Sequence, residues 1–415
     1  MWSRKRFDID YIDLIYGLGA ALTVGNSQRQ GLQNELEDWW ISDSTGEAIA
    51  CLSVRSGWDL LLQALQLPPG SEVAMSALTI PDMVTIVRHH GLVPVPIDLD
   101  PMTMAPDPAS LDRAIGPQTR VIIIAHLFGG RVNLEPILAA RDRVGAILVE
   151  DCAQAFTPGF RGHPDADVSC FSFGNIKFAT ALGGALLRVR DPQLGDCLRQ
   201  IQSTYPVQDS GHYTRRLLKY LGLKTLSSRP GFTALIWGCR RLGIDYDRLL
   251  NQSVKGFPKD ELIPRLRHQP WETLLALLRR RLQGYTEERL AAQTHRGQRL
   301  IQLLQDYCPQ ILVPGVATLP HVHWVVPILA QDPEMAIATL ANAGFDSTQG
   351  NSMTVVNPPE THLEWEPRNA REIFKHLLYL PCYPAMDDTT LVSMAQALRP
   401  IFSPSVSEFL RMGSP

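Results

Sequence analysis

The sequence predicts an α/β fold, in which a mainly parallel sheet flanked by helices forms a large domain and a smaller α+β domain follows. Between residues 49 and 150, short apolar runs alternate with segments of helical periodicity. This strand–helix–strand repetition is typical of a parallel sheet that is covered by helices on both faces. The chain has 415 residues, which is enough for two domains.

Each expected element follows from its local pattern. Apolar and β-branched runs predict strands, and apolar positions that recur every three or four residues predict helices. In the large domain we expect strands at 49–54, 72–76, 93–97, 120–125, 146–149, 168–173 and 185–189, and helices at 28–40, 58–67, 81–91, 109–115 and 135–144. In the small domain we expect helices at 271–282, 287–306, 335–343 and 391–398, and strands at 321–329 and 377–381.

We expect the large domain over residues 1–258 and the small C-terminal domain over 259–415. A basic helical insertion is expected at about 191–258, since residues 211–250 contain eight Lys or Arg against two Asp and are rich in Leu, Tyr, Phe and Trp. The simpler interpretation is an added helical subdomain with a solvated basic face. The sharper hypothesis is a surface for an acidic or lipid-like partner.

Composition argues against several classes of protein. The formal net charge of −3 gives no indication of a nucleic-acid partner. The seven cysteines include no CxxC pair, so neither a disulfide framework nor a zinc site is indicated, and their spread fits a reducing cytoplasm. His321 and His323 alternate on an expected strand with no third ligand nearby, so we expect no metal. No uncharged apolar stretch reaches membrane-spanning length.

One pair of segments combines an acid at a strand end with an isolated lysine. The expected strand at 146–149 leads directly to Glu150 and Asp151, and Lys177 follows the next strand, with Ser172 shortly before it. Such a set suits a pyridoxal phosphate site, where an acid holds the pyridine nitrogen protonated, a lysine forms an imine, and hydroxyls meet the phosphate. The alternative is a helix cap at Asp151 and a surface lysine at Lys177.

Order and spacing favour the functional interpretation. The segments EDCAQA (150–155) and FSFGNIK (171–177), with Gly183-Gly184 after them, resemble the DegT/StrS family of sugar aminotransferases, which have the type I pyridoxal phosphate fold. That family carries E-D-x-A-Q/H-x and S-F-x-x-x-K segments followed by Gly-Gly. LPCYP (380–384) is similar to its closing L-P-x-Y-P segment. The resemblance covers about residues 45–190 and 265–400.

The resemblance implies roles for particular residues. Lys177 would hold pyridoxal 5'-phosphate as an aldimine and move protons, and Asp151 would face the ring nitrogen. Ser172, Ser56 and the Gly57 N–H would hold the phosphate, and Gln154 would lie near the ring. Further implied cofactor contacts are Trp58, Ile80, Asn175 and Arg265, the last of which aligns with a family asparagine that reaches the neighbouring subunit's phosphate. For Ser56 an ordinary N-cap, and for Arg265 plain surface charge, remain alternatives.

Some positions depart from the family pattern. Ile80 stands where the family has an aromatic residue that stacks on the ring, and Trp58 stands where it has threonine. Residues 345–348 lack the family's His-Tyr-Pro pattern. Because these changes lie on the substrate side, we expect retained cofactor chemistry with a less usual acceptor.

The implied function is transfer of an amino group from an amino acid, with glutamate as the expected donor, to a keto-sugar nucleotide or a related biosynthetic ketone. The alternatives are a pyridoxal phosphate-dependent dehydratase or eliminase of the same fold, and a non-catalytic, cofactor-binding regulatory protein. The resemblance also implies a homodimer with shared active sites.

Overall fold

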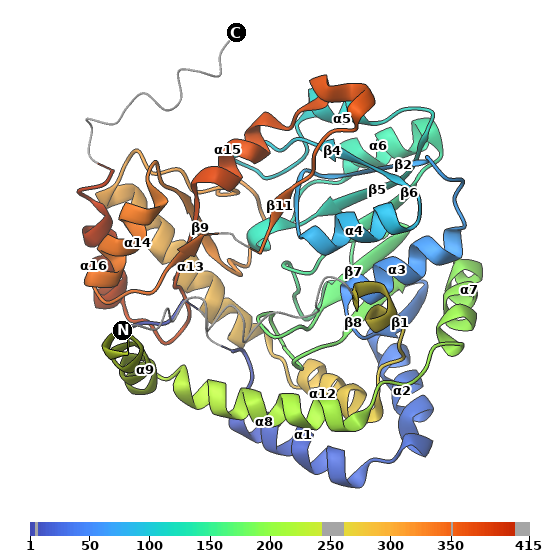
Figure 1. The fold of residues 1–415 in the computed structure, drawn as a ribbon, viewed down its shortest axis with the longest axis horizontal. Helices are drawn as coiled ribbons and strands as arrows, with labels where there is room; N and C mark the ends of the chain where they lie inside the picture. The colour runs from blue at the N-terminus through green and yellow to red at the C-terminus, as the bar shows by residue number, and fades with distance from the viewer. Residues whose placement is uncertain (5–6, 243–260, 350–351, 403–415) are drawn as a thin grey trace.

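The computed structural model describes residues 1–4, 7–242, 261–349 and 352–402, and its centre is a seven-stranded sheet (Figure 1). The strand order is β1-β8-β7-β6-β5-β2-β4. These strands are β1 (Glu47–Cys51), β2 (Glu72–Ser76), β4 (Val93–Ile97), β5 (Thr119–Ala125), β6 (Ile147–Asp151), β7 (Val168–Ser172) and β8 (Ala185–Val189). The ladders from β7 to β4 are parallel, and β8 runs antiparallel to both β7 and β1. The carboxyl ends of all strands except β8 therefore meet at one edge, which confirms the predicted mainly parallel sheet.

Alternating side chains divide the core of the large domain. On β5, Val121 and Ile123 face a layer that contains α3 (Val54–Leu65), α4 (Pro81–His89) and α7 (Pro192–Ser203). Ile122 and Ile124 point the other way, toward α5 (Pro108–Ala114) and α6 (Glu135–Val144). This period of two, with both sets apolar, is what a sheet buried on both faces requires.

Helices from both ends of the sequence cover the sheet beside β1, β7 and β8. They are α1 (Tyr11–Thr23), α2 (Arg29–Ile41), α8 (Ser210–Leu226) and α12 (Glu272–Gln283), with α9 (Arg229–Arg241) after α8 and α11 (Leu262–Leu266) before α12. Leu274, Leu277 and Leu278 of α12 share one core cluster with Leu14 of α1 and Leu217 of α8. The packing of the large domain thus continues past residue 258, where the sequence suggested a boundary. The part of the expected insertion at 243–258 lies outside the described residues.

The small domain is an antiparallel sheet covered by helices. Its strand order is β10-β12-β9, and the elements are β9 (Val326–Leu329), β10 (Thr348–Gln349), β12 (Leu377–Leu380), α13 (Glu287–Tyr307), α14 (Pro333–Asn342), α15 (Arg368–His376) and α16 (Asp388–Leu398). The N-terminus joins this domain, since Trp2 bridges Phe345 and Arg4 Nη2 lies 2.6 Å from Asp346 Oδ1. A two-stranded ladder, β3 (Leu78–Thr79) with β11 (Thr354–Val355), links the two domains.

Two expected elements have different bounds for local reasons. Ser53 accepts the N–H of Ser56 and caps α3, so this helix begins at Val54 rather than at Trp58, and β1 ends at Cys51. A Ser hydroxyl at this position satisfies an N–H that has no partner inside the helix. The expected strand 321–329 shortens to β9, and His321 makes only an isolated bridge with Gly130. Short 3-10 turns occur at Asn26–Gln28, Leu127–Gly129 and Glu360–Trp365. Among the described helices, none combines the length and apolar character needed to cross a bilayer.

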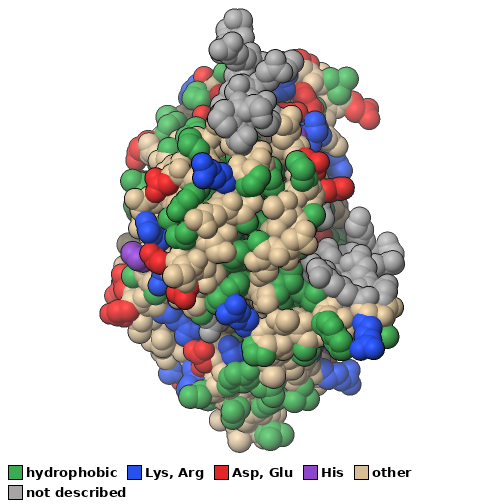
Figure 2. Space-filling model, turned by 90° about the vertical axis from the view of Figure 1, so that its left-hand side faces the viewer, with side chains coloured by type: hydrophobic (Ala, Val, Ile, Leu, Met, Phe, Trp, Pro, Cys, Tyr) green, Lys and Arg blue, Asp and Glu red, His purple; other side chains and the backbone are tan. Residues whose placement is uncertain are grey.

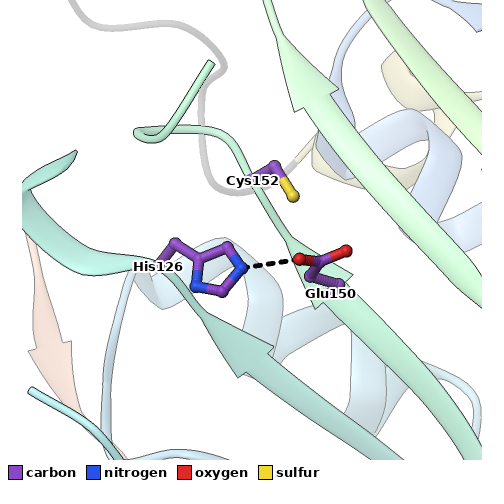
Figure 3. A group of neighbouring side chains, drawn as sticks. All are labelled: His126, Glu150 and Cys152. Carbon is purple, nitrogen blue, oxygen red and sulfur yellow. Dashed lines mark hydrogen bonds and ion pairs between the residues drawn. The ribbon is translucent and has the colours of Figure 1, made fainter. Parts of the chain in front are cut away.

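A buried carboxylate, Glu150 on β6, ties three neighbouring strands together (Figure 3). Its Oε1 lies 2.7 Å from Nε2 of His126, which follows β5, and its Oε2 accepts Ser169 Oγ of β7 at 2.8 Å and the His163 N–H at 2.7 Å. Burial alone would raise the pKa of Glu150, but these donors lower it to about 2. Glu150 is therefore a satisfied buried anion, which fixes the end of β6.

We predict that Glu150→Gln lowers the free energy of unfolding at neutral pH by about 3 kcal/mol. A carboxyl whose pKa is lower in the folded state than in the unfolded state stabilises above its unfolded value and loses that contribution as pH falls through its folded value. The difference between wild type and variant should therefore shrink as pH falls from about 5 toward 2 in urea titrations. Glu135→Gln, at an exposed carboxylate of α6, is the control. Equal stability of wild type and Glu150→Gln at neutral pH would contradict the prediction.

Candidate functional site

Most of the predicted site residues lie at the carboxyl edge of the sheet. Parallel strands place whatever follows them at this edge, where α/β proteins bind ligands. Asp151 ends β6, Ser172 ends β7, and Asn175 and Lys177 lie in the turn after β7. Ile80 follows β2 and caps α4, Ser56 lies in the first turn of α3 after β1, and Gln154 lies in the loop after β6.

Asp151 and Lys177 interact electrostatically. Burial raises the pKa of Asp151, while the Ala153 N–H at 3.0 Å and the positive charge of Lys177 oppose that rise. The parallel pairing of β6 with β7, which sets Asp151 opposite Cys170, brings the turn that carries Lys177 next to the acid. An acid that depends on nearby cations for its ionisation suits a ligand that presents a positive charge to it.

Trp324 is the residue at this site that the sequence reasoning missed. The Lys177 Nζ lies 3.9 Å from the centre of the Trp324 ring, and the indole N–H donates to the Ile176 carbonyl at 2.9 Å. Trp324 thus holds both the turn and the ammonium group, the latter by a cation–π contact. No local pattern could reveal this contact, because Trp324 is far from Lys177 in the chain.

The segment that carries Trp324 is fixed to the loop after β5. Val322 N–H donates to the Gly129 carbonyl at 2.9 Å, and Arg131 N–H donates to the Pro320 carbonyl at 3.0 Å. Within this loop Phe128 has a left-handed backbone, with φ 61°, and its N–H donates to Gln154 Oε1 at 2.7 Å. Gln154 therefore supports the loop that positions Trp324. This hydrogen bond also fixes the orientation of the Gln154 side-chain amide.

The loop after Lys177 is held by Asp8, which precedes α1, and by α8 and α12. Ala179 and Leu182 have left-handed backbones, with φ 49° and 60°, which costs roughly 1–2 kcal/mol at each non-glycine residue. The contacts that hold this loop are Ala179 N–H to Asp8 Oδ2 at 2.9 Å, Arg281 Nε to the Thr180 carbonyl at 3.1 Å, Arg216 Nη1 to the Leu182 carbonyl at 3.0 Å, and the Tyr213 hydroxyl to the Ala181 carbonyl. These contacts stabilise the loop with the left-handed backbones of Ala179 and Leu182, which would be unfavourable without them.

Two residues expected to contact the cofactor, Gly57 and Trp58, are engaged within the fold. The Gly57 N–H donates to the Ser53 carbonyl at 3.0 Å inside α3, so it is not available to a phosphate. A Cβ at Gly57 would lie 2.5 Å from Leu187 Cδ1, which gives this glycine a packing role against β8. The Trp58 side chain is fully buried, and its Nε1 lies 3.4 Å from the Met83 carbonyl. Both differences arise because α3 begins one turn earlier than expected.

Other candidate groups are already engaged. Arg265 is exposed and pairs with Glu261, with Nε at 2.7 Å from Oε2, whereas Arg267 binds the buried Asp59 of α3 at 2.9 Å. His321 and His323 stack with ring centres 4.1 Å apart, and burial lowers their pKa values to about 3 and about 4.

His126, Glu150 and Cys152 lie close enough to suggest a metal cluster (Figure 3). His126 Nδ1 accepts the Val132 N–H at 3.1 Å, however, so its proton lies on Nε2 and is given to Glu150. Both ring nitrogens are therefore used within the protein, and burial raises the pKa of the Cys152 thiol well above its usual range. The cluster serves the fold rather than offering ligands.

The residues present fit pyridoxal phosphate. The acid at the end of β6 would meet a ring nitrogen that carries a proton, the amine of Lys177 follows the neighbouring strand and lies over the Trp324 ring, and Ser172 ends that strand. An acid, an amine and a hydroxyl at adjacent strand ends form the donor set that this cofactor requires.

Comparison with known proteins supports this fit. The model of the DegT/DnrJ/EryC1/StrS aminotransferase family matches residues 28–225. The chain is 32% identical over 158 residues to GDP-perosamine synthase of Caulobacter vibrioides, covering 37% of this chain and 43% of that protein. It is 35% identical over 172 residues to the erythromycin biosynthesis sensory transduction protein EryC1 of Saccharopolyspora erythraea, covering 40% and 47%. The matched region thus spans less than half the length of these curated relatives.

The fold extends the likeness over nearly the whole chain. The aminotransferase TlmJ from Streptoalloteichus hindustanus superposes with a TM-score of 0.68 at 17% identity, covering 96% of this chain and 98% of that one. At this identity the likeness establishes the fold alone. Over residues 28–225, which carry both Asp151 and Lys177, the chain matches the model of the DegT/DnrJ/EryC1/StrS aminotransferase family.

Proposed function

We propose that this protein is a pyridoxal phosphate-dependent aminotransferase. It would move an amino group from an amino acid, with glutamate as the expected donor, to the ketone of a nucleotide-linked sugar or a related biosynthetic ketone. The observation that carries the proposal is the placement of Asp151 at the end of β6 and of Lys177 in the turn after the neighbouring strand β7, at the carboxyl edge of the sheet. The family match and the name of the perosamine synthase relative support the substrate class.

Each residue has a distinct task in this proposal. Pyridoxal phosphate, when bound, supplies an aldehyde that reacts with amines and a ring that accepts electron density. The Asp151 carboxylate would hold a proton at the ring nitrogen. The Lys177 Nζ would hold the cofactor and, when an amino donor takes its place, would accept the proton from the donor's Cα. Trp324 would keep that amine in position.

Phosphate binding would rest on hydroxyls and a second subunit. Ser172 ends β7 and Ser56 lies in the first turn of α3, where the helix dipole favours an anion. Ile80 and Asn175 lie at the same edge and would contact the ring and its substituents. Arg265 would exchange its exposed pair with Glu261 for the phosphate of a partner's site, because a guanidinium binds phosphate by two parallel donors.

Lys177→Ala should abolish covalent cofactor attachment and amino transfer. Borohydride reduction followed by peptide mapping should add the cofactor's mass to the wild-type peptide that contains Lys177 and to no peptide of the variant. Glutamate should discharge the absorbance of the lysine-bound form in wild type. Lys375→Ala, at an exposed position of α15, should behave as wild type. A labelled peptide elsewhere would refute the assignment, ammonia release without amino transfer would favour an eliminase, and colourless protein that binds no cofactor would favour a regulatory role.

Trp324→Leu should lower kcat by about 10-fold with little change in the KM of the donor, because the cation–π contact and the hydrogen bond to Ile176 are both lost. Trp324→Phe keeps a ring under the ammonium group and loses only the hydrogen bond, so its kcat should lie between those of Leu and wild type. Steady-state kinetics at saturating cofactor measures both. An unchanged kcat in Trp324→Leu would show that the contact has no part in positioning Lys177.

A dimer with shared sites makes a further testable prediction. Light scattering should give twice the chain mass of 46.2 kDa. If Arg265 acts on the partner's site, Arg265→Ala and Lys177→Ala should each be inactive alone. Unfolding and refolding them together should restore about a quarter of wild-type activity, since half of the randomly formed dimers would hold one intact site. A monomer, or mixtures as inactive as the single variants, would contradict shared sites.

A further inference from the structure

The outer helices of the large domain form an apolar and basic surface that the proposed reaction does not use. We call it the α1–α8–α9 face and define it by its exposed residues Tyr11, Ile12, Ile15, Tyr16, Leu22, Arg215, Leu218, Lys219, Leu226, Arg229, Trp237, Arg241 and Leu242. Figure 2 shows hydrophobic side chains gathered at the lower end of the molecule, where α1 and α8 lie in Figure 1.

The helices α1 and α8 lie side by side and antiparallel. The Tyr11 hydroxyl lies 3.2 Å from Thr225 Oγ1, and Gly17 packs against Leu217. Both helices rest on the buried helix α12. The sides of α1 and α8 that face away from α12 therefore form one continuous solvent-exposed surface.

The outward stripe of α1 is apolar where a solvated helix would be charged. Ile12, Ile15 and Leu22 are 69%, 62% and 88% exposed. Within α1 the only acidic residue is Asp13, which is buried and paired with Arg280 and Arg281. A surface helix is expected to turn its polar face outward. A helix that is apolar on both faces indicates that something covers the outer one.

The neighbouring helices supply positive charge and no negative charge. The sequence of α8 and α9 contains Lys and Arg but neither Asp nor Glu. Several cations lie over aromatic rings of the face: Lys224 Nζ is 5.2 Å from the Tyr11 ring, Arg241 Cζ is 5.2 Å from the Trp237 ring, and Arg280 Cζ is 4.7 Å from the Tyr16 ring. Arg229 and Trp237 also line a shallow hollow of about 540 Å³.

We propose that the α1–α8–α9 face binds the surface of an anionic lipid bilayer. Exposed Ile, Leu, Tyr and Trp side chains would enter the boundary between headgroups and acyl chains, while Arg215, Lys219 and Arg229 would meet lipid phosphates. A second copy of this chain is a less favourable partner. A symmetric interface would bring two copies of this positively charged face together, and the like charges would repel.

The proposal predicts binding that needs both kinds of residue. The full-length protein should sediment with vesicles of phosphatidylglycerol and phosphatidylcholine, should not sediment with phosphatidylcholine alone, and should be released by high salt. The triple variant Ile12→Ser/Ile15→Ser/Leu22→Ser should bind at least about 10-fold more weakly, and Arg215→Gln/Lys219→Gln roughly 10-fold more weakly. Since all five side chains are exposed, these variants should fold normally.

The control is Leu319→Ser/Leu363→Ser, which removes two exposed apolar side chains outside the three helices, with exposures of 79% and 68%. It should bind vesicles as wild type does. Absence of wild-type binding to anionic vesicles would overturn the proposal. So would equal binding by the wild type, the apolar variant, the basic variant and the control. So would a change of oligomeric state in the apolar variant, which would assign the face to self-association, or tighter binding of an acidic carrier protein than of vesicles to the same residues. Transaminase activity is not needed for this assay, so its outcome is independent of the proposed function.

Discussion

The geometry of the site depends on one buried anion, the carboxylate of Glu150. Successive residues on a strand point to opposite faces, so Glu150 and Asp151 cannot face the same environment. Glu150 turns into the protein, where His126, Ser169 and the His163 N–H satisfy it. Asp151 consequently points to the opposite face of the sheet. A buried charge that is fully hydrogen-bonded resists displacement, because any shift would leave donors or the charge unpaired.

The surroundings of Lys177 are provided in part from far along the chain. The 320–324 segment pairs with the loop after β5 and delivers Trp324 to Lys177, while β11 pairs with β3 beside Ile80. Two segments of the C-terminal half are thus anchored on the large domain by backbone hydrogen bonds close to the predicted site. Trp324 provides a surface for the flexible lysine side chain, and the charge of Lys177 opposes the rise that burial causes in the pKa of Asp151.

The sequence was sufficient for the fold and for placing Asp151 and Lys177 after neighbouring strands, since both follow from local patterns. Alternating apolar runs predicted the parallel sheet, and the strand-end acid and the later lysine predicted Asp151 and Lys177. The helix cap at Ser53 could have been predicted, because a serine three residues before Ser56 is a recognisable helix start. That earlier start of α3 would have changed the expected roles of Gly57 and Trp58. Local patterns could not predict the contact of Trp324, the loop contacts of Arg281 or the packing of α12 on α1, because these join distant segments through tertiary structure.

The inner side of α8 and the neighbouring helix α12 hold the loop after Lys177. Arg281 of α12 binds both Asp13 of α1 and the Thr180 carbonyl, at 2.6 and 3.1 Å, and Tyr213 and Arg216 of α8 bind the two following carbonyls. Asp8 and Asp10 precede α1 and pair with Arg289. Asp8 and Asp13 therefore act on the inner side, where they help to fix a strained loop, while Arg215, Lys219 and Arg229 lie on the outer side. The arrangement that supports Lys177 is thus also the one that leaves this surface apolar and basic.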